Sequence, residues 1–305
     1  MRILSIGNSF SSDAHRWIHD LSVAGGHPIE TVNLYIGSCS LKQHALNAQN
    51  NTADYLLEVN GVAVREGVTL LDTLRDGSYD VVTLQQVSSA SGLLASYTPY
   101  ADDLADLIRQ EQPAADVVIH QTWAYDNDSD LELFIAYNRS QDMMYDKLSK
   151  AYDIMAMAID AKVIPSGDLV QELRESPYFA KEGAVYSSYD PDLELEPFPE
   201  ASMNPDTPPS LTRDGFHLNY YYGRYAVACL WYAIFSGTPS AQVDWTPPKP
   251  AQMPANQDLK PEVWAYIRET ADRLAKENID YQAEQLGDVP DIGTIPGANL
   301  PDHLN

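Results

Sequence analysis

The sequence has few cysteines and few basic residues. Two cysteines, Cys39 and Cys229, cannot form a disulfide framework or a zinc site with four cysteine ligands. Lys and Arg together number 19 against 44 Asp and Glu, so the formal net charge is -25 at pH 7. Proteins that bind nucleic acid or anionic membrane surfaces need a basic patch, and the basic residues here do not cluster. We therefore expect neither kind of partner.

Long apolar runs are also missing. The longest, residues 225–235, is too short to cross a bilayer. Only six residues precede Gly7, which leaves no room for the apolar stretch of a signal peptide, so we expect a cytoplasmic protein. What the chain does have is an apolar fraction of 44% over 305 residues. That composition and length predict one large α/β domain with an appendage.

Apolar runs alternate with helical patterns along most of the chain. Strands are predicted at residues 2–6, 29–36, 79–85, 116–120 and 161–164, with helices at 13–24, 100–110 and 132–159. Such alternation predicts a parallel sheet of about five strands that is covered by helices on both faces. Asn60 and Gly61, flanked by apolar residues, predict a hairpin at the sheet edge.

The composition changes toward the C-terminus. Residues 176–210 are rich in Pro, Asp, Glu, Ser and Tyr and predict a long loop or lid. An apolar helix follows and ends at Gly237, so we place the main domain at residues 1–237. Residues 238–305 then read as a proline-rich linker, an amphipathic helix and a polar tail that pack on the main domain.

Three loops carry the chemistry that we expect at the carboxyl ends of the strands, where α/β proteins bind ligands. The first is Gly-Asn-Ser-Phe-Ser-Ser, residues 7–12, in which Ser9 is either an exposed nucleophile on a tight turn or a helix cap. The second contains Gly37. The third is Asp-Gly-Phe-His, in which a carboxylate at Asp214 can orient a histidine at His217.

The order and spacing of these loops resemble the SGNH, or GDSL-type, hydrolases. The resemblance covers about residues 1–237 and is greatest to a bacterial branch in which Gly-Asn-Ser replaces Gly-Asp-Ser. It implies a three-layer flavodoxin-like fold and serine ester hydrolysis. In that mechanism Ser9 would be the nucleophile, His217 the general base and Asp214 the group that orients the base.

The same resemblance implies an oxyanion hole made by the backbone N–H groups of Ser9 and Gly37. The sequence departs from the family where an asparagine amide would complete this hole. Here the third strand ends in Leu-Gln-Gln, so Gln85 or Gln86 would supply the amide, and strand alternation lets only one of them face the site.

Other polar and aromatic residues are candidates for substrate contact. His120 and Trp123 follow the fourth strand, and Tyr220 follows His217. Each of them could also be a packing residue. His15 and His19 are four residues apart, but Arg16 replaces the glutamate of a zinc protease motif, so we expect no metal site and no cofactor.

The expected activity is hydrolysis of small O-acyl esters, chiefly acetyl esters of carbohydrates. The carbohydrate part follows from the resemblance and from the aromatic residues near the site. A lipid or thioester hydrolase and a catalytically silent binding module are the alternatives. Because the chain is strongly anionic, we expect neutral or cationic esters unless Arg213 or Arg224 offsets the field locally. The pattern predicts no oligomeric state.

Overall fold

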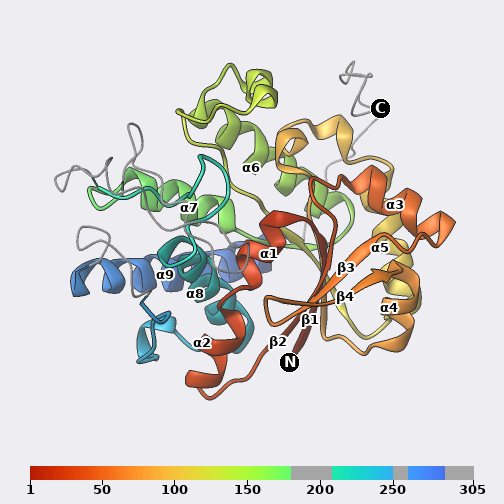
Figure 1. Ribbon diagram of the computed structural model, residues 1–305, viewed down its shortest axis with the longest axis horizontal. Helices are drawn as coiled ribbons and strands as arrows, with labels where there is room; N and C mark the ends of the chain where they lie inside the picture. The colour runs from red at the N-terminus through yellow and green to blue at the C-terminus, as the bar shows by residue number, and fades with distance from the viewer. Residues whose placement is uncertain (180–207, 250–259, 286–305) are drawn as a thin grey trace.

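A seven-stranded mixed sheet lies at the centre of the computed structural model, with helices on both faces (Figure 1). The structure describes residues 1–179, 208–249 and 260–285. Within these residues the strand order is β4-β3-β2-β1-β5-β6-β7. The strands are β1 (Arg2–Gly7), β2 (Glu30–Tyr35), β3 (Tyr55–Val59), β4 (Val62–Val68), β5 (Val81–Leu84), β6 (Asp116–His120) and β7 (Lys162–Ile164).

Five of these strands, β2-β1-β5-β6-β7, run parallel to one another. They have the order of a flavodoxin-like fold, so the three-layer α/β prediction is confirmed. The predicted parallel sheet of about five strands and the predicted hairpin at its edge are both confirmed. The hairpin β3-β4 adds two antiparallel strands because β3 pairs with the edge strand β2. Asn60 and Gly61 form its turn with φ angles of 52° and 73°.

The helices form the two outer layers (Figure 1). One layer packs around the apolar helix α8 (Tyr222–Ser236) and contains α1 (Ser9–His15), α2 (Ile18–Ala24), α7 (Ser166–Glu175) and α9 (Pro261–Gln285). On the other face α3 (Leu41–Asn50), α4 (Leu70–Asp76) and α5 (Tyr100–Glu111) pack on one another. Helix α6 (Gln141–Ala158) packs against β6 and β7. The loops between these layers meet above the carboxyl ends of β1, β2 and β5.

Two predicted helices are each divided in the structure. The helix expected at 13–24 is two helices, because the backbone of Trp17 leaves helical geometry and its indole N–H donates to the carbonyl oxygen of Tyr220 at 2.8 Å. The helix expected at 132–159 is a 3₁₀ helix, η3 (Glu132–Tyr137), followed by α6. Asn138 and Arg139, with φ of 52° and 51°, separate them, since left-handed residues cannot continue a right-handed helix.

The C-terminal helix α9 shares the core of the sheet domain. Its buried residues Val263, Ile267, Ala271 and Ala275 belong to the same apolar cluster as the residues of α8. Most of the predicted lid, residues 180–207, lies outside the described residues, as do residues 250–259 of the linker and the tail at 286–305. Among the described helices, none has both the length and the apolar character needed to span a bilayer.

Candidate active site

The turn between β1 and α1 presents Ser9. Asn8 caps the helix, because its side-chain oxygen accepts a hydrogen bond from the backbone N–H of Phe10 at 3.0 Å. Gly7 is required at the end of β1, since a Cβ atom there would lie 2.3 Å from Ser11 Oγ. Ser9 is the first residue of α1, so its backbone N–H has no acceptor within the helix. Both the hydroxyl and the N–H of Ser9 are therefore available at one point.

The loop before α8 presents Asp214 and His217. Thr212 and Leu218 form an isolated bridge that closes the loop. Inside it, Asp214 Oδ1 accepts hydrogen bonds from the backbone N–H groups of Phe216 at 3.1 Å and His217 at 2.8 Å. The carboxylate is thereby held by its own turn, and its second oxygen is left for the histidine ring.

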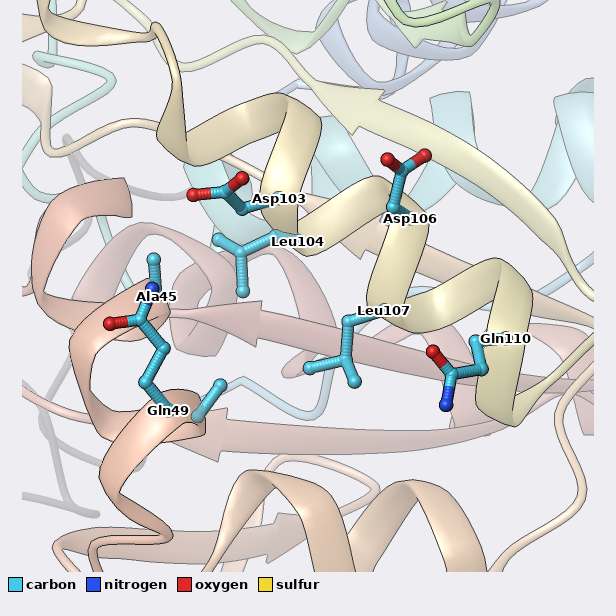
Figure 2. Close-up of a pocket in the computed structure, with 8 residues that line it drawn as sticks. Ala45, Gln49, Asp103, Leu104, Asp106, Leu107 and Gln110 are labelled. Atoms are coloured by element: carbon cyan, nitrogen blue, oxygen red, sulfur yellow. The ribbon is translucent and has the colours of Figure 1, made fainter.

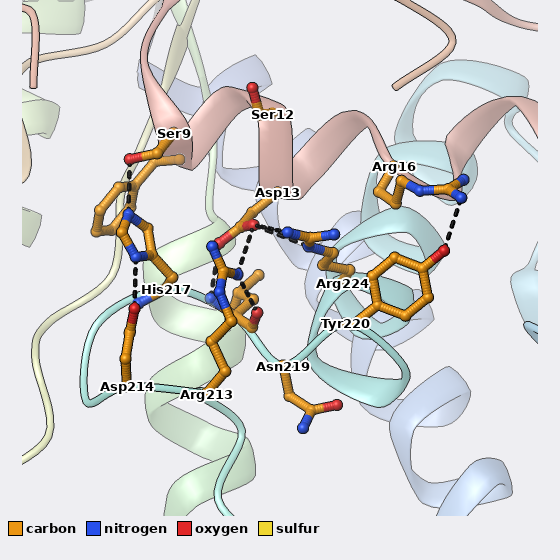
Figure 3. Close-up of polar contacts among 12 residues, drawn as sticks. Ser9, Ser12, Asp13, Arg16, Arg213, Asp214, His217, Asn219, Tyr220 and Arg224 are labelled. Atoms are coloured by element: carbon orange, nitrogen blue, oxygen red, sulfur yellow. Dashed lines mark hydrogen bonds and ion pairs between the residues drawn. The ribbon is translucent and has the colours of Figure 1, made fainter. Parts of the chain in front are cut away.

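Ser9, His217 and Asp214 form one hydrogen-bonded chain (Figure 3). The distance from Ser9 Oγ to His217 Nε2 is 2.8 Å, and that from His217 Nδ1 to Asp214 Oδ2 is 2.7 Å. An ionised carboxylate only accepts hydrogen bonds, so Nδ1 carries the proton and Nε2 accepts from the serine hydroxyl. The histidine side chain is 18% exposed and the aspartate side chain 37%. His217, oriented by Asp214, can therefore accept the hydroxyl proton of Ser9 at a solvent-accessible position.

A cavity of about 510 Å³ adjoins this chain of hydrogen bonds. Ser9 and His217 line it, together with Asn8, Phe10, Ser38, Val87, Ser88, Ser89, Tyr125, Leu131, Glu132, Leu133 and Phe216. The loop after β2 reaches this cavity through Ser38, whose φ is 55°, and not through the exposed Gly37. The expected oxyanion role of the Gly37 backbone N–H stays a prediction, and Ser38 is the residue of this loop that lines the cavity.

Gln85 and Gln86 do not line the cavity, because their amides hold the surrounding loops. The amide nitrogen of Gln85 donates to Asn8 Oδ1 at 2.7 Å. Gln86 accepts from the backbone N–H of Leu41 at 3.0 Å and donates to the carbonyl oxygen of Ser96 at 2.9 Å. The expected role of either glutamine as an oxyanion donor is therefore corrected: Gln85 lies beneath the cap of α1, and Gln86 fixes the start of α3.

His120, a candidate for substrate contact in the sequence, is a buried core residue. Its ring is fully buried, and burial lowers its pKa to about 3, so the ring is neutral. Its Nδ1–H donates to Gln85 Oε1 at 2.8 Å. A buried chain of hydrogen bonds therefore runs from His120 through Gln85 to Asn8, and it supports the turn that carries Ser9.

Trp123 and Tyr220 also hold the site instead of lining its main cavity. Trp123 is fully buried, stacks on Phe10 with a centroid distance of 4.4 Å, and donates to the carbonyl oxygen of Phe216 at 2.7 Å. Tyr220 is 6% exposed, and its hydroxyl accepts from Arg16 at 2.7 Å. Aromatic residues near His217 predicted substrate contact, but their rings are used to pack the loop against α1.

Asp13 is a buried residue of the site that sequence reasoning missed. Its Oδ1 accepts from Arg213 Nη1 at 3.0 Å and Arg224 Nε at 2.8 Å, and its Oδ2 accepts from the backbone N–H of Leu218 at 2.7 Å (Figure 3). Burial alone would raise the pKa of Asp13, but the two guanidinium groups outweigh it and lower the pKa. Asp13 lies one turn after Ser9, so it ties the nucleophile helix to the histidine loop.

His15 and His19 point to different partners. His15 Nε2 lies 2.8 Å from Ser5 Oγ, and His19 Nδ1 lies 3.0 Å from the carbonyl oxygen of Ile29.

A further cavity of about 340 Å³ lies between α3 and α5, and Ser9 does not line it (Figure 2). The residues around it are Ala45, Ala48, Gln49, Asp103, Leu104, Asp106, Leu107 and Gln110. Neither the pair of histidines, His15 and His19, nor this cavity belongs to the site at Ser9.

Several solved structures are similar to this chain, and one of them, with a TM-score of 0.73, supports the fold. A DUF4886 family protein from Bacteroides uniformis is 26% identical, with a TM-score of 0.73 over 90% of this chain and 94% of that chain. A candidate SGNH hydrolase from Slackia heliotrinireducens is 19% identical, with a TM-score of 0.47 over 76% and 97% of the two chains. An acetylxylan esterase from Geobacillus stearothermophilus is 10% identical, with a TM-score of 0.44 over 81% of this chain and 97% of that chain.

No curated protein matches the sequence. The model of one family, described as a domain of unknown function, DUF4886, matches residues 2–204. This match covers well over half of the 305 residues and includes the turn at Ser9. The chain therefore belongs to the DUF4886 family.

Proposed function

We propose that the protein is a serine ester hydrolase that removes small O-acyl groups, with acetyl esters of carbohydrates as its substrates. The observation that carries the proposal is the chain of hydrogen bonds from Ser9 to His217 to Asp214, with distances of 2.8 Å and 2.7 Å, beside an accessible cavity. A serine, a histidine and a carboxylate in this geometry have the roles of nucleophile, base and orienting group.

Acylation begins when Ser9 Oγ attacks the carbonyl carbon of the ester. The hydroxyl proton passes to His217 Nε2, and the imidazolium is stabilised by the Asp214 carboxylate at Nδ1. When the tetrahedral intermediate collapses, the bond between the carbonyl carbon and the alcohol oxygen breaks. His217 returns its proton to that oxygen, so the alcohol leaves neutral and the acyl group stays on Ser9.

Deacylation repeats the sequence with water as the nucleophile. His217 takes a proton from water, the resulting hydroxide attacks the acyl carbon, and the bond from that carbon to Ser9 Oγ breaks. The proton then passes from His217 to Ser9, and a carboxylic acid is released. His217 and Asp214 end in their starting states, so the cycle needs no oxidant, reductant or metal.

The negative charge of each intermediate needs donors that are already in place. The backbone N–H of Ser9 is one, because it is the first in α1 and has no acceptor within the helix. The loop that carries Ser38 into the cavity supplies the second candidate. Asn8 keeps these two loops together, since its amide nitrogen donates to the carbonyl oxygen of Cys39 at 3.1 Å.

Gln85→Met tests whether this glutamine positions the loop or stabilises the oxyanion. The substitution keeps the volume but removes the hydrogen bonds to Asn8 and His120. We expect a loss of about 1–3 kcal/mol in the free energy of unfolding, because buried partners are left unpaired. We expect only about a tenfold loss of kcat for an aryl acetate, less than the about 10²–10³-fold that follows removal of an oxyanion donor.

The matched control for this change is Gln110→Met, at an exposed position on α5. Urea unfolding and steady-state kinetics on both variants give the two readouts. A loss of kcat above a hundredfold without any loss of stability would contradict the positioning role and return Gln85 to the oxyanion hole.

The proposed nucleophile is tested by covalent labelling. A serine-directed organophosphonate is expected to add one phosphonyl group to the wild-type protein, and peptide mass spectrometry is expected to place the adduct on Ser9. Ser9→Ala is expected to remain unlabelled, whereas Ser12→Ala, one turn further along α1, is expected to keep the adduct. An adduct in Ser9→Ala, or none in the wild type, would contradict the proposal.

The acyl preference is tested with aryl esters of increasing chain length. Acetyl and propionyl esters are expected to have the highest kcat/KM. A maximum at long acyl chains or with thioesters would favour the alternative of a lipid or thioester hydrolase. Labelling without turnover of any ester would leave a binding module with a reactive serine.

A further inference from the structure

A second cavity, of about 350 Å³, meets the first one at Ser9. Ser9 is the single residue that lines both, so the nucleophile lies where the two cavities meet. The other residues that line this second cavity are Ser12, Asp13, Arg16, Tyr35, Leu56, Glu58, Gly61, Val62, Ala63, Arg213 and Arg224. An ester has two arms that meet at its carbonyl carbon, so the arrangement offers a separate place for each arm.

The second cavity is walled by α1 and the β3-β4 hairpin. Ser9, Ser12 and Arg16 follow one another at helical spacing along one side. Gly61, at the hairpin tip, closes the far end: a Cβ atom on it would lie 2.8 Å from the Cα atom of Arg16. Only glycine lets the hairpin approach α1 this closely, and its φ of 73° demands glycine as well. The glycine at the hairpin tip therefore lets the hairpin lie close enough to α1 to form this wall.

Two side chains that line the second cavity, Glu58 and Tyr35, have groups that can bind hydroxyls. Glu58 Oε2 accepts from Ser12 Oγ at 2.6 Å and from Asn33 Nδ2 at 2.8 Å, which fixes the carboxylate. In the described parts of the chain, Glu58 Oε1 and the Tyr35 hydroxyl have no hydrogen-bond partner. One acceptor and one group that can both donate and accept are therefore free to bind a ligand.

The formal charges around the second cavity nearly cancel, because Arg16, Arg213 and Arg224 line it together with Asp13 and Glu58. Arg213 and Arg224 both bind the Asp13 carboxylate, so much of their charge is compensated. Glu58 adds a further carboxylate at the wall, and the whole chain carries a formal net charge of -25. A polyhydroxylated neutral group satisfies the free oxygen atoms without introducing an unpaired charge.

The two cavities differ in chemistry. The first is lined by six apolar or aromatic residues, and its ionisable residues are Glu132 and His217, whereas five charged side chains line the second. The second is lined mainly by charged and hydroxyl groups. An acyl chain suits the first and a hydroxylated alcohol the second. His217 Nε2 lies 2.8 Å from Ser9 Oγ, at the junction, where it can protonate the departing alcohol.

We propose that the second cavity is the alcohol subsite and binds a neutral sugar ring next to the ester, with Glu58 accepting hydrogen bonds from the ring hydroxyls. This inference rests on the proposed hydrolysis of carbohydrate esters and adds to it the place where the sugar binds and the residue that selects it. Ser12 and Asn33 hold Glu58 in place, and the Tyr35 hydroxyl is the second contact.

The test compares two acetate esters that differ only in the alcohol. One is 4-nitrophenyl acetate, and the other is an acetylated neutral xylo-oligosaccharide. In Glu58→Gln, the ratio of kcat/KM for the sugar ester to that for the aryl ester is expected to fall about tenfold or more, because a hydrogen bond to a charged acceptor is lost. Glu66→Gln, an exposed position on the same hairpin, is the matched control and is expected to keep the wild-type ratio.

A second variant blocks the cavity without touching the buried hydrogen bonds. Ala63 is exposed and pairs with Glu58 across the hairpin, so Ala63→Trp places a large ring beside the carboxylate. The same fall in the ratio is expected. A wild-type ratio in both variants would overturn the subsite and leave the esterase proposal standing. A changed preference between acetyl and butyryl aryl esters would assign the cavity to the acyl arm and also overturn the proposal.

Binding of the free oligosaccharide separates the subsite from the activity. Ser9→Ala is titrated with the deacetylated xylo-oligosaccharide and binding is followed by saturation-transfer NMR. Binding is expected in Ser9→Ala and is expected to be lost in the Ser9→Ala, Glu58→Gln double variant. If the wild type hydrolyses neither ester, the proposed function is wrong, and this titration alone decides the subsite. No difference between the single and double variants would contradict it.

Discussion

Ser9→Ala and His217→Ala are each expected to lower kcat for 4-nitrophenyl acetate by about 10⁴–10⁶-fold. The hydroxyl of Ser9 and the ring of His217 lie 2.8 Å apart and act in the same proton transfer. Removing either one stops formation of the acyl-enzyme. The double variant is therefore expected to lose no more activity than the single variants, because residues that act as a unit are not additive.

Stopped-flow and steady-state kinetics measure this loss, with circular dichroism to show that the variants are folded. Asp214→Asn provides a graded comparison: the amide keeps the shape but changes the hydrogen bond to Nδ1, so its loss is expected to be about 10⁴-fold. His27→Ala, an exposed histidine before β2, is the control. If the loss of kcat in the double variant equalled the product of the two single-variant losses, Ser9 and His217 would not act in one step.

Asp13→Ala is expected to lower the free energy of unfolding by about 3–5 kcal/mol, the cost of leaving buried charges without their partner. The substitution removes the acceptor shared by Arg213, Arg224 and the backbone N–H of Leu218. It also releases the histidine loop from α1. We therefore expect kcat to fall with stability, even though Asp13 belongs to none of the reacting groups.

Urea unfolding of the wild type, Asp13→Ala and the exposed control Asp20→Ala gives the measurement. Asp20→Ala is expected to stay within about 0.5 kcal/mol of the wild type. The pKa of Asp13 is lowered from 3.8 in the folded protein, so its stabilising contribution is present above pH 3.8 and is lost as the pH falls through the lower folded pKa. Equal unfolding midpoints for wild type and Asp13→Ala at pH 7 would contradict the role of this network.

Local patterns predicted much of the sheet. Strand β6 has the predicted bounds, Asp116–His120, because an apolar run between polar loops leaves little choice of register. Helix bounds were less predictable. The break at Trp17 depends on a hydrogen bond to Tyr220, more than two hundred residues away, and no local pattern contains that partner. Asn138 and Arg139 divided another helix through their left-handed backbone, which propensity alone does not require.

The residues near the proposed site show the same division. A short strand-to-helix turn and a three-residue spacing are local features, so the sequence pointed to Ser9, Asp214 and His217, and the resemblance to SGNH hydrolases supplied their expected roles. The roles of Gln85, His120 and Trp123 were not predictable, since each depends on a partner brought from another strand or loop. Polar and aromatic residues after a strand can either line a cavity or support it, and only packing decides between the two.

Sequence alone determined the α/β class, the parallel order of alternating strands and helices, and the three loops that carry Ser9, Gly37 and His217. These properties follow from periodicity and turn chemistry within a few residues. Tertiary structure alone decided that Asp13 joins two guanidinium groups to the histidine loop, that Ser38 lines the cavity in place of Gly37, and that the hairpin walls a second cavity at Ser9. These depend on contacts between distant segments, whose free energy comes from burial and charge pairing that no local pattern encodes.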